Sequence, residues 1–141
     1  MHHPLPRDTV AIAINSEWRR SQQQLHLHID CLAKNVADAL ADSAPSLDET
    51  WRAMTVALNG RKYLARRLSS ADLADAEPLK LLAEGVDGAR SHMDDYSLAA
   101  VGATFDGKPG FILLADRLSP EGGGHAEDLQ DHDCAIVQSA P

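Results

Sequence analysis

The chain has 141 residues, enough for one domain, and its formal charge of −8 at pH 7 opposes binding to nucleic acid or to an anionic membrane through the net field of the molecule. Only 4% of the residues are aromatic, too few for a surface that stacks nucleic-acid bases. No apolar run has the length of a membrane span, and no signal-peptide pattern opens the sequence. We therefore expect a single globular domain over residues 1–141.

The first half of the chain predicts two strands, a helix and a hairpin. The first strand is apolar and partly β-branched, and a polar turn separates it from a second, antiparallel strand in which polar and apolar residues alternate. Val36 and Leu40 lie one helical turn apart. The expected segments are strands at 9–15 and 24–32, a helix at 34–42, and a hairpin of 51–58 and 61–68 around Asn59-Gly60, the preferred type I′ turn dipeptide.

The second half predicts short helices, another hairpin and a final helix. Ser70 is expected to cap a helix, Pro78 to occupy the first position of the next one, and the glycines at 122–124 to form a flexible hinge. The expected segments are helices at 70–75, 78–85 and 87–93, strands at 97–105 and 111–116 joined by 106–110, and an acidic helix at 125–136. Hairpins mixed with helices predict an α+β fold with an antiparallel sheet.

The strand at 24–32 carries the clearest candidate site. Side chains on a strand alternate between its two faces, so the polar set can form a site while the apolar set anchors the strand in a core. The polar face holds Gln24, His26, His28 and Asp30, and the apolar face holds Leu25, Leu27 and Ile29.

A polar strand face most often meets water, but the neighbouring residues favour a site here. Ser21 precedes the two histidines, Asn15 ends the first strand, and Arg19 and Arg20 add two cations. Phosphoryl chemistry requires such donors and positive charges around a nucleophile.

These residues carry a resemblance to a known family. Ser21-x-x-Gln24-x-His26-x-His28 resembles the histidine-triad signature, with Gln24 in place of the first histidine. The wider string from Pro4 to Cys31 is similar to one branch of that superfamily, the CDP-diacylglycerol pyrophosphatases. The likeness continues in order at 63–67, 82–86, 89–90, 92–93 and 129–134.

The resemblance implies a histidine-triad-like antiparallel sheet with flanking helices, from which this chain would lack the N-terminal part of the family fold. It implies hydrolysis of CDP-diacylglycerol to CMP and phosphatidate with no cofactor and no metal. His26 would be the nucleophile that forms a nucleotidyl-histidine, His28 would donate to the non-bridging oxygens, and Ser21 would reach the phosphate or the leaving oxygen. Substrate binding is expected from Asn15, Arg20 and Gln24.

The expected ligand is a membrane lipid, CDP-diacylglycerol or a related nucleotide pyrophosphate, and nucleic acid is not an expected partner. By family analogy the enzyme belongs to the bacterial inner membrane with its catalytic domain outside the cytoplasm, although this chain shows no anchor. The same analogy implies a disulfide between Cys31 and Cys134. A homodimer is a further expectation, since an exposed sheet edge invites pairing.

Two other interpretations stay open. The face with His26, His28 and Asp30 is also a metal-ligand set, which fits a metal-dependent hydrolase. A truncated chain is alternatively an inactive or weakly nucleotide-binding remnant of the fold. His132, between two aspartates, is expected to pair with a carboxylate rather than bind a metal, because alternate residues on a helix do not face each other.

Overall fold

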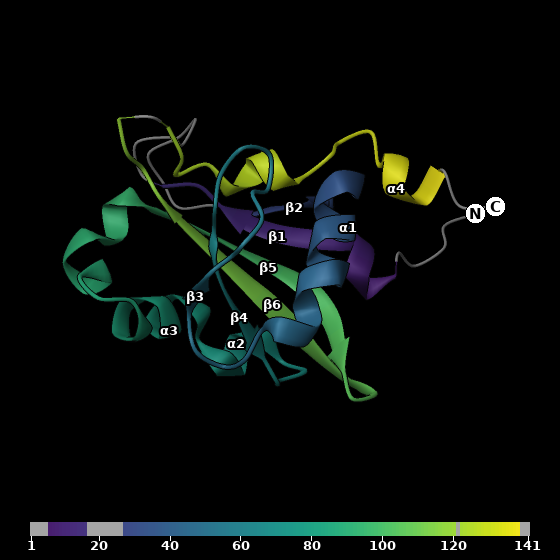
Figure 1. Ribbon diagram of the computed structural model, residues 1–141, viewed down its shortest axis with the longest axis horizontal. Coiled ribbons are helices and arrows are strands. Elements are labelled where there is room, and N and C mark those ends of the chain that lie inside the picture. The colour runs from purple at the N-terminus through teal and green to yellow at the C-terminus, as the bar shows by residue number, and fades with distance from the viewer. Residues whose placement is uncertain (1–5, 17–26, 121, 139–141) are drawn as a thin grey trace.

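The computed structural model describes residues 6–16, 27–120 and 122–138. A six-stranded sheet in the order β2-β1-β5-β6-β4-β3 forms the centre of the molecule, and every pair of neighbouring strands is antiparallel (Figure 1). The α+β class with an antiparallel sheet is therefore confirmed. The strands are β1 (Val10–Ile14), β2 (His28–Cys31), β3 (Arg52–Ala53), β4 (Leu64–Leu68), β5 (Tyr96–Phe105) and β6 (Lys108–Arg117).

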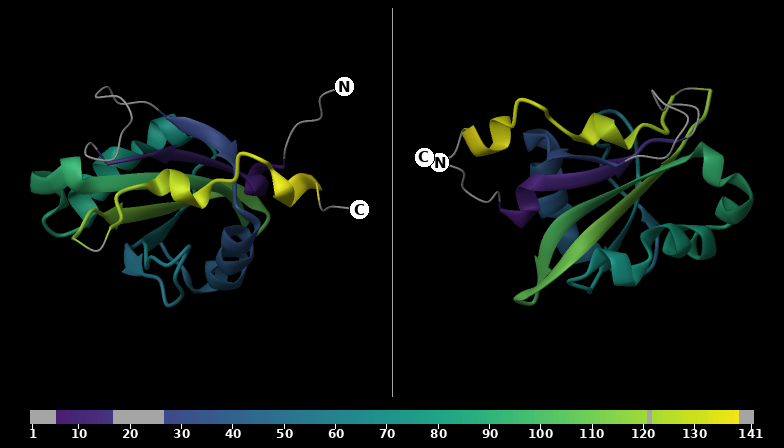
Figure 2. Two further views of the ribbon diagram at one scale, coloured as in Figure 1. Left: turned by 90° about the horizontal axis from the view of Figure 1, so that it is seen from above. Right: turned by 180° about the vertical axis from the view of Figure 1, so that it is seen from behind.

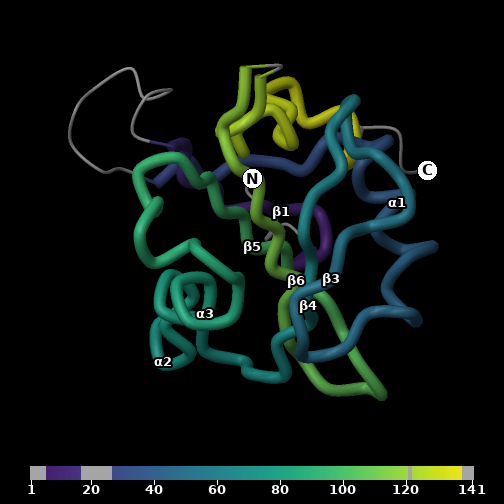
Figure 3. The backbone as a smooth tube through the Cα atoms, turned by 60° about the vertical axis from the view of Figure 1, so that its left-hand side comes forward, coloured from purple at the N-terminus to yellow at the C-terminus, as the bar shows by residue number. Residues whose placement is uncertain are grey.

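Helices pack on both faces of the sheet, with α1 on one side and α2 and α3 on the other (Figure 3). We call these two sides the α1 face and the α3 face. The α-helices are α1 (Lys34–Ser43), α2 (Leu73–Ala76), α3 (Pro78–Gly85) and α4 (Ala135–Gln138). The 3-10 helices are η1 (Arg7–Thr9), η3 (Ala44–Ser46), η4 (Ala89–Asp95) and η5 (Ala126–Leu129).

Two hydrophobic layers hold the helices to the sheet. On the α1 face, Val36 and Leu40 of α1 are buried against Ala11 and Ala13 of β1, which confirms the predicted helix spacing. On the α3 face, Leu82 of α3 packs with side chains of β5 and β6. The helices of the α3 face thus cover mainly β5, β6 and β4.

In both hairpins two residues with positive φ form the turn, but the strands differ in length from the predicted ones. Asn59 and Gly60 both have positive φ, as a type I′ turn requires. The segments on either side pair over a shorter length than predicted, through β3 and β4, the bond from the Met54 N–H to the Tyr63 carbonyl and the Leu58–Arg61 bridge. In the second hairpin Asp106 and Gly107 form a two-residue turn with positive φ at both positions. The loop expected at 106–110 is therefore shorter, because β6 begins at Lys108.

Two predictions on helices were wrong. Asp72, not Ser70, caps α2, since its carboxylate accepts from the backbone N–H groups of Ala74 and Asp75. The helix expected at 125–136 is instead the short η5, an extended stretch and the single turn of α4. In that stretch the backbone of Gln130 pairs with Leu32 just after β2, so inter-strand bonds replace helical ones.

The C-terminal segment, residues 122–138, therefore runs across the sheet beside β1 and β2 (Figure 2). Ala126 and Leu129 of η5 are fully buried in the layer on the α1 face. None of the helices in the described part of the chain has the length and apolar composition needed to cross a bilayer.

Candidate active site

The register of β2 decides which of its side chains face the α1 side. His28 pairs with Ala13 and Asp30 with Ala11, and both alanines are buried on the α1 face. Residues directly opposite on antiparallel strands point the same way, so His28 and Asp30 lie on the α1 face and are half-buried.

The expectation that the apolar side of this strand anchors a core was wrong for the two residues that the structure describes. Leu27 is 53% exposed and Ile29 is 66% exposed. The reason is that β2 is an edge strand, and the described parts of α2 and α3 do not extend over it. Leu25 lies outside the described residues.

A carboxylate from the C-terminal segment meets the histidine of β2. Oε2 of Glu127, in η5, lies 3.2 Å from Nδ1 of His28, and each side chain is 23% exposed. Asn15, at the end of β1 and 3% exposed, holds the same glutamate twice. Its Nδ2 donates to Oε2 at 3.4 Å, and its Oδ1 accepts from the backbone N–H of Glu127 at 3.1 Å.

A second histidine extends this network. Nδ1 of His132 bonds to the carboxylate of Asp30, and Nε2 of His132 lies 3.5 Å from Oε1 of Glu127. The hydrogen bond to Asp30 raises the pKa of the His132 imidazole, and the same bond lowers the pKa of the Asp30 carboxyl. The expectation that His132 pairs with a carboxylate is thus confirmed, although it lies in a turn rather than on a helix.

Two further contacts fix the C-terminal segment to the strands. The side-chain amide of Gln130 donates to the carbonyls of Ala11 and His28, at 2.6 and 2.7 Å. Cys31 and Cys134 form a disulfide, which confirms the pairing that the family resemblance implied. These contacts keep Glu127 beside His28.

Among the described residues, the structure brings together two of the predicted site residues. His28 and Asn15 are joined through Glu127. The other predicted site residues, Arg20, Ser21, Gln24 and His26, lie outside the described residues.

Sequence reasoning missed Glu127 and Gln130 as site residues because the sequence predicts a single acidic helix over their segment, residues 125–136. One signal could have found them. The expected disulfide to Cys31 already required the residues before Cys134 to lie beside β2.

The carboxylate of Asp30 has protein partners of its own. Its Oδ1 accepts from the backbone N–H of Cys31 at 2.8 Å, and its other oxygen bonds to His132. Asp30 also lies close to the sulfurs of Cys31 and Cys134, but these are joined in the disulfide and offer no thiolate.

Two arginines away from β2 make structural contacts. Arg61 forms an ion pair with the buried carboxylate of Asp116, at 3.2 Å. The guanidinium of Arg67 stacks over the ring of Phe105, near the tip of the β5–β6 hairpin. Both contacts are ordinary roles for arginine in a folded domain.

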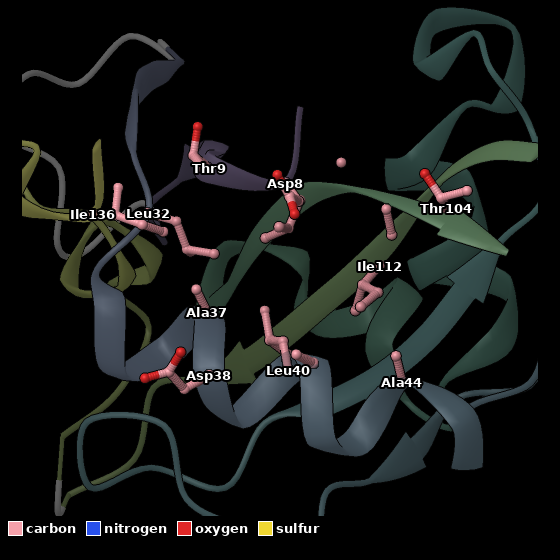
Figure 4. Close-up of a pocket in the computed structure, with 14 residues that line it drawn as sticks. Asp8, Thr9, Leu32, Ala37, Asp38, Leu40, Ala44, Thr104, Ile112 and Ile136 are labelled. Carbon is pink, nitrogen blue, oxygen red and sulfur yellow. The ribbon is translucent and has the colours of Figure 1, made fainter. Parts of the chain in front are cut away.

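A cavity of about 490 Å³ also opens on the α1 face, between α1 and the sheet (Figure 4). Its lining contains the carboxylates of Asp8 and Asp38 and, among the described residues, no cationic side chain. Such a lining repels an anionic phosphate, so this cavity is a poor candidate for the site of phosphoryl chemistry.

Comparison with known protein families identifies the family of the chain. The family model described as CDP-diacylglycerol pyrophosphatase matches residues 1–138 of the 141-residue chain. The match runs through β1, β2 and the C-terminal segment, which supply Asn15, His28 and Glu127. The chain therefore belongs to the CDP-diacylglycerol pyrophosphatase family, a family of hydrolases.

Proposed function

We propose that this chain hydrolyses CDP-diacylglycerol to CMP and phosphatidate through a nucleotidyl-histidine intermediate in a histidine-triad-like site. Membership of the family supports the substrate and the reaction. The observation that carries the location of the site is the contact of His28 with Glu127, whose carboxylate also bonds to Asn15.

The proposed reaction has two displacement steps. An imidazole nitrogen of His26 attacks the phosphorus that carries cytidine, and the bond from that phosphorus to the bridging oxygen breaks. The bridging oxygen leaves with phosphatidate, and the CMP moiety stays on the histidine. Water then attacks the same phosphorus, the phosphorus–nitrogen bond breaks, and CMP and the imidazole are released.

His28 would act on the charge that develops during both steps. A carboxylate only accepts hydrogen bonds, so Glu127 favours the imidazole form that carries a proton on Nδ1. Donation to a non-bridging phosphate oxygen requires the imidazolium form of His28, in which Nε2, on the opposite side of the ring from Glu127, carries a proton as well. A preorganised donor of this kind typically contributes about a hundredfold to a thousandfold in rate.

The remaining substrate contacts follow the family resemblance. Ser21 would reach the phosphate or the leaving oxygen, and Arg20 and Gln24 would bind the pyrophosphate. Asn15 holds Glu127, so its part in catalysis includes the orientation of His28 through that carboxylate.

We further propose that the protein acts on a membrane lipid, at the bacterial inner membrane with its catalytic domain outside the cytoplasm. The disulfide between Cys31 and Cys134 supports an oxidising compartment. We also expect a homodimer.

The test uses purified protein and CDP-diacylglycerol in which the cytidine-side phosphate is labelled. Release of labelled CMP is expected from the wild type. His26→Asn should abolish turnover, and His28→Asn should lower kcat about a hundredfold or more. His92→Asn is the matched control, because His92 is half-exposed in η4 and contacts Asp95 instead of Glu127.

Hydrolysis in ¹⁸O-labelled water locates the attack. The proposal places the label in CMP; label in phosphatidate would contradict attack at the cytidine-side phosphorus. Loss of activity after chelation, restored by a divalent metal, would favour the metal-dependent hydrolase. If the protein binds CMP in a titration but releases no CMP from the lipid, the alternative of an inactive, nucleotide-binding remnant of the fold would be favoured.

A further inference from the structure

An apolar groove lies on the α3 face of the sheet, behind the strand that carries His28. Its volume is about 350 Å³, near the lower end of the range of roughly 300–1,000 Å³ for small-molecule pockets. None of the lining side chains is charged or forms hydrogen bonds. They come from β1, β5, α2, α3 and the residue before β2, and include Ile12, Ile14, Leu27, Leu73, Leu79 and Leu98.

Exposed apolar side chains gather around this groove. In the described part of the chain four large hydrophobic residues are exposed, and three of them belong here. Leu27 and Leu79 line the groove, and Ile29 pairs with Ile12 in its wall. The fourth, Val56, is not among the lining residues. Apolar surface concentrated in one concave place marks a binding site more often than scattered exposure does.

The groove and the candidate active site share a strand. Leu27 precedes His28 directly, and the two neighbours serve opposite faces of the sheet. Among the described strands β2 is the outermost, with β1 as its only partner. A flexible chain that is attached to a phosphate beside His28 can therefore turn around β2 and enter the groove.

We propose that the groove binds one acyl chain of the CDP-diacylglycerol substrate, an inference that rests on the proposed function. The family to which this chain belongs acts on a diacylglycerol compound, so its substrate offers acyl chains a few bonds from the scissile pyrophosphate. A bilayer is a weaker occupant, because a net charge of −8 opposes docking on an anionic lipid surface.

The first test varies the acyl chain and leaves the headgroup unchanged. The full chain is assayed with CDP-glycerol and with CDP-diacylglycerols of short, increasing chain length, each below its micelle concentration. If one acyl chain enters the groove, kcat/KM should rise by up to about fourfold for each methylene added to that chain, until the groove is filled. Equal kcat/KM for all these substrates would overturn the groove proposal and leave the hydrolase proposal standing.

The second test places a charge in the groove. Leu79 is 41% exposed on α3, so Leu79→Asp should fold, and it should lower kcat/KM for the acylated substrates about tenfold or more while leaving CDP-glycerol hydrolysis unchanged. Val56→Asp is the matched control, because Val56 is 42% exposed outside the groove lining. Equal effects of the two variants would contradict the proposal.

A third measurement does not depend on turnover. A phosphatidate analogue with a photoreactive group in one acyl chain should label the wild type at residues of the groove, and Leu79→Asp should lose this labelling. Labelling there without any hydrolysis would uphold the groove and reject the proposed function. Labelling elsewhere, or a wild-type dimer that Leu79→Asp dissociates, would overturn the acyl site; the dimer would assign the groove to a second copy of the chain.

Discussion

Glu127 and His28 meet at 3.2 Å although they lie near opposite ends of the described chain. The glutamate reaches the histidine because η5 is buried against β1 and because Asn15 holds both its side chain and its backbone N–H. A carboxylate in this position orients an imidazole and selects which ring nitrogen carries the proton. Within the proposed mechanism Glu127 is therefore a positioning residue.

We predict that Glu127→Gln lowers kcat about 10- to 100-fold, by comparison with other carboxylates that orient a functional histidine. An amide can donate as well as accept, so it no longer favours the His28 form with its proton on Nδ1. KM should change little, and Glu127→Asp should retain more activity than Glu127→Gln. Steady-state kinetics over a pH series checks both expectations.

The control for this prediction is Asp128→Asn, which changes a neighbouring carboxylate that bonds to His125. Both variants remove one negative charge from the same short helix. An equal loss of kcat in the two variants would mean that the local charge matters and the contact with His28 does not.

The sequence allowed prediction of which residues share a face of β2, but not of which face is covered. Alternation depends only on the strand backbone, so the separation of His28 and Asp30 from Leu27 and Ile29 could be read directly. Coverage depends on where α2 and α3 pack, and they cover the strands on the other side of β1. The apolar side of β2 is consequently the exposed one.

The sequence did not predict Glu127 as a site residue for a different reason. The sequence predicts an acidic helix over its segment, whereas in the structure contacts with distant residues stabilise that segment. Leu129 accepts a backbone bond from Ala33, and Gln130 bonds to the carbonyls of β1 and β2. Such contacts between distant segments leave little trace in local periodicity, and only the expected Cys31–Cys134 pairing indicated them.

We predict that the disulfide accounts for much of the stability of the C-terminal segment. Cys31 and Cys134 are 103 residues apart, and closing so long a loop stabilises by up to about 4–5 kcal/mol in the chain-entropy model. Reductant should lower the denaturation midpoint of the wild type and leave that of a Cys31→Ala/Cys134→Ala double variant unchanged. Alkylation of the denatured, unreduced protein should label neither cysteine. Labelling of both would refute the bond.

We predict a pH window in which the pair of His132 and Asp30 adds stability. The raised pKa of His132 gives a contribution that is complete below the ordinary value of 6.5 and is lost as pH rises through the raised value. The lowered pKa of Asp30 gives a second contribution to stability, which is fully present above pH 3.8 and is lost as pH falls through the lowered pKa. Together they are greatest between about pH 3.8 and 6.5.

Urea denaturation of the wild type and of His132→Ala across pH 3 to 9, about the range of ordinary carboxyl and histidine titration, measures this contribution. The effect should be small, because the His132 side chain is 62% exposed and solvent screens the pair. Salt should reduce it further. A difference between the two proteins that does not change with pH would show that His132 acts through packing instead.

We predict that Gly124→Ala costs more stability than the left-handed backbone alone explains. A Cβ at this position would lie 2.7 Å from Oγ of buried Ser16, which directly follows Asn15, and φ is +68°. Gly88 also has positive φ, +80°, but its Cβ would meet nothing within 4 Å, so Gly88→Ala isolates the backbone cost of about 1–2 kcal/mol. The extra cost at Gly124 should be about 1 kcal/mol or more, as for other overpacked sites.

The same substitution should reach the site. The backbone N–H of Ser16 donates to the carbonyl of Gly124 at 2.8 Å and helps to hold Ser16 in place. A displacement of Gly124 should therefore move the end of β1. Asn15 would then hold Glu127 less well, and kcat should fall several-fold in Gly124→Ala and not in Gly88→Ala. Denaturant midpoints and steady-state rates of both variants decide the matter. Equal values for the two proteins would show that the close approach of Gly124 to Ser16 has no part in positioning the histidine.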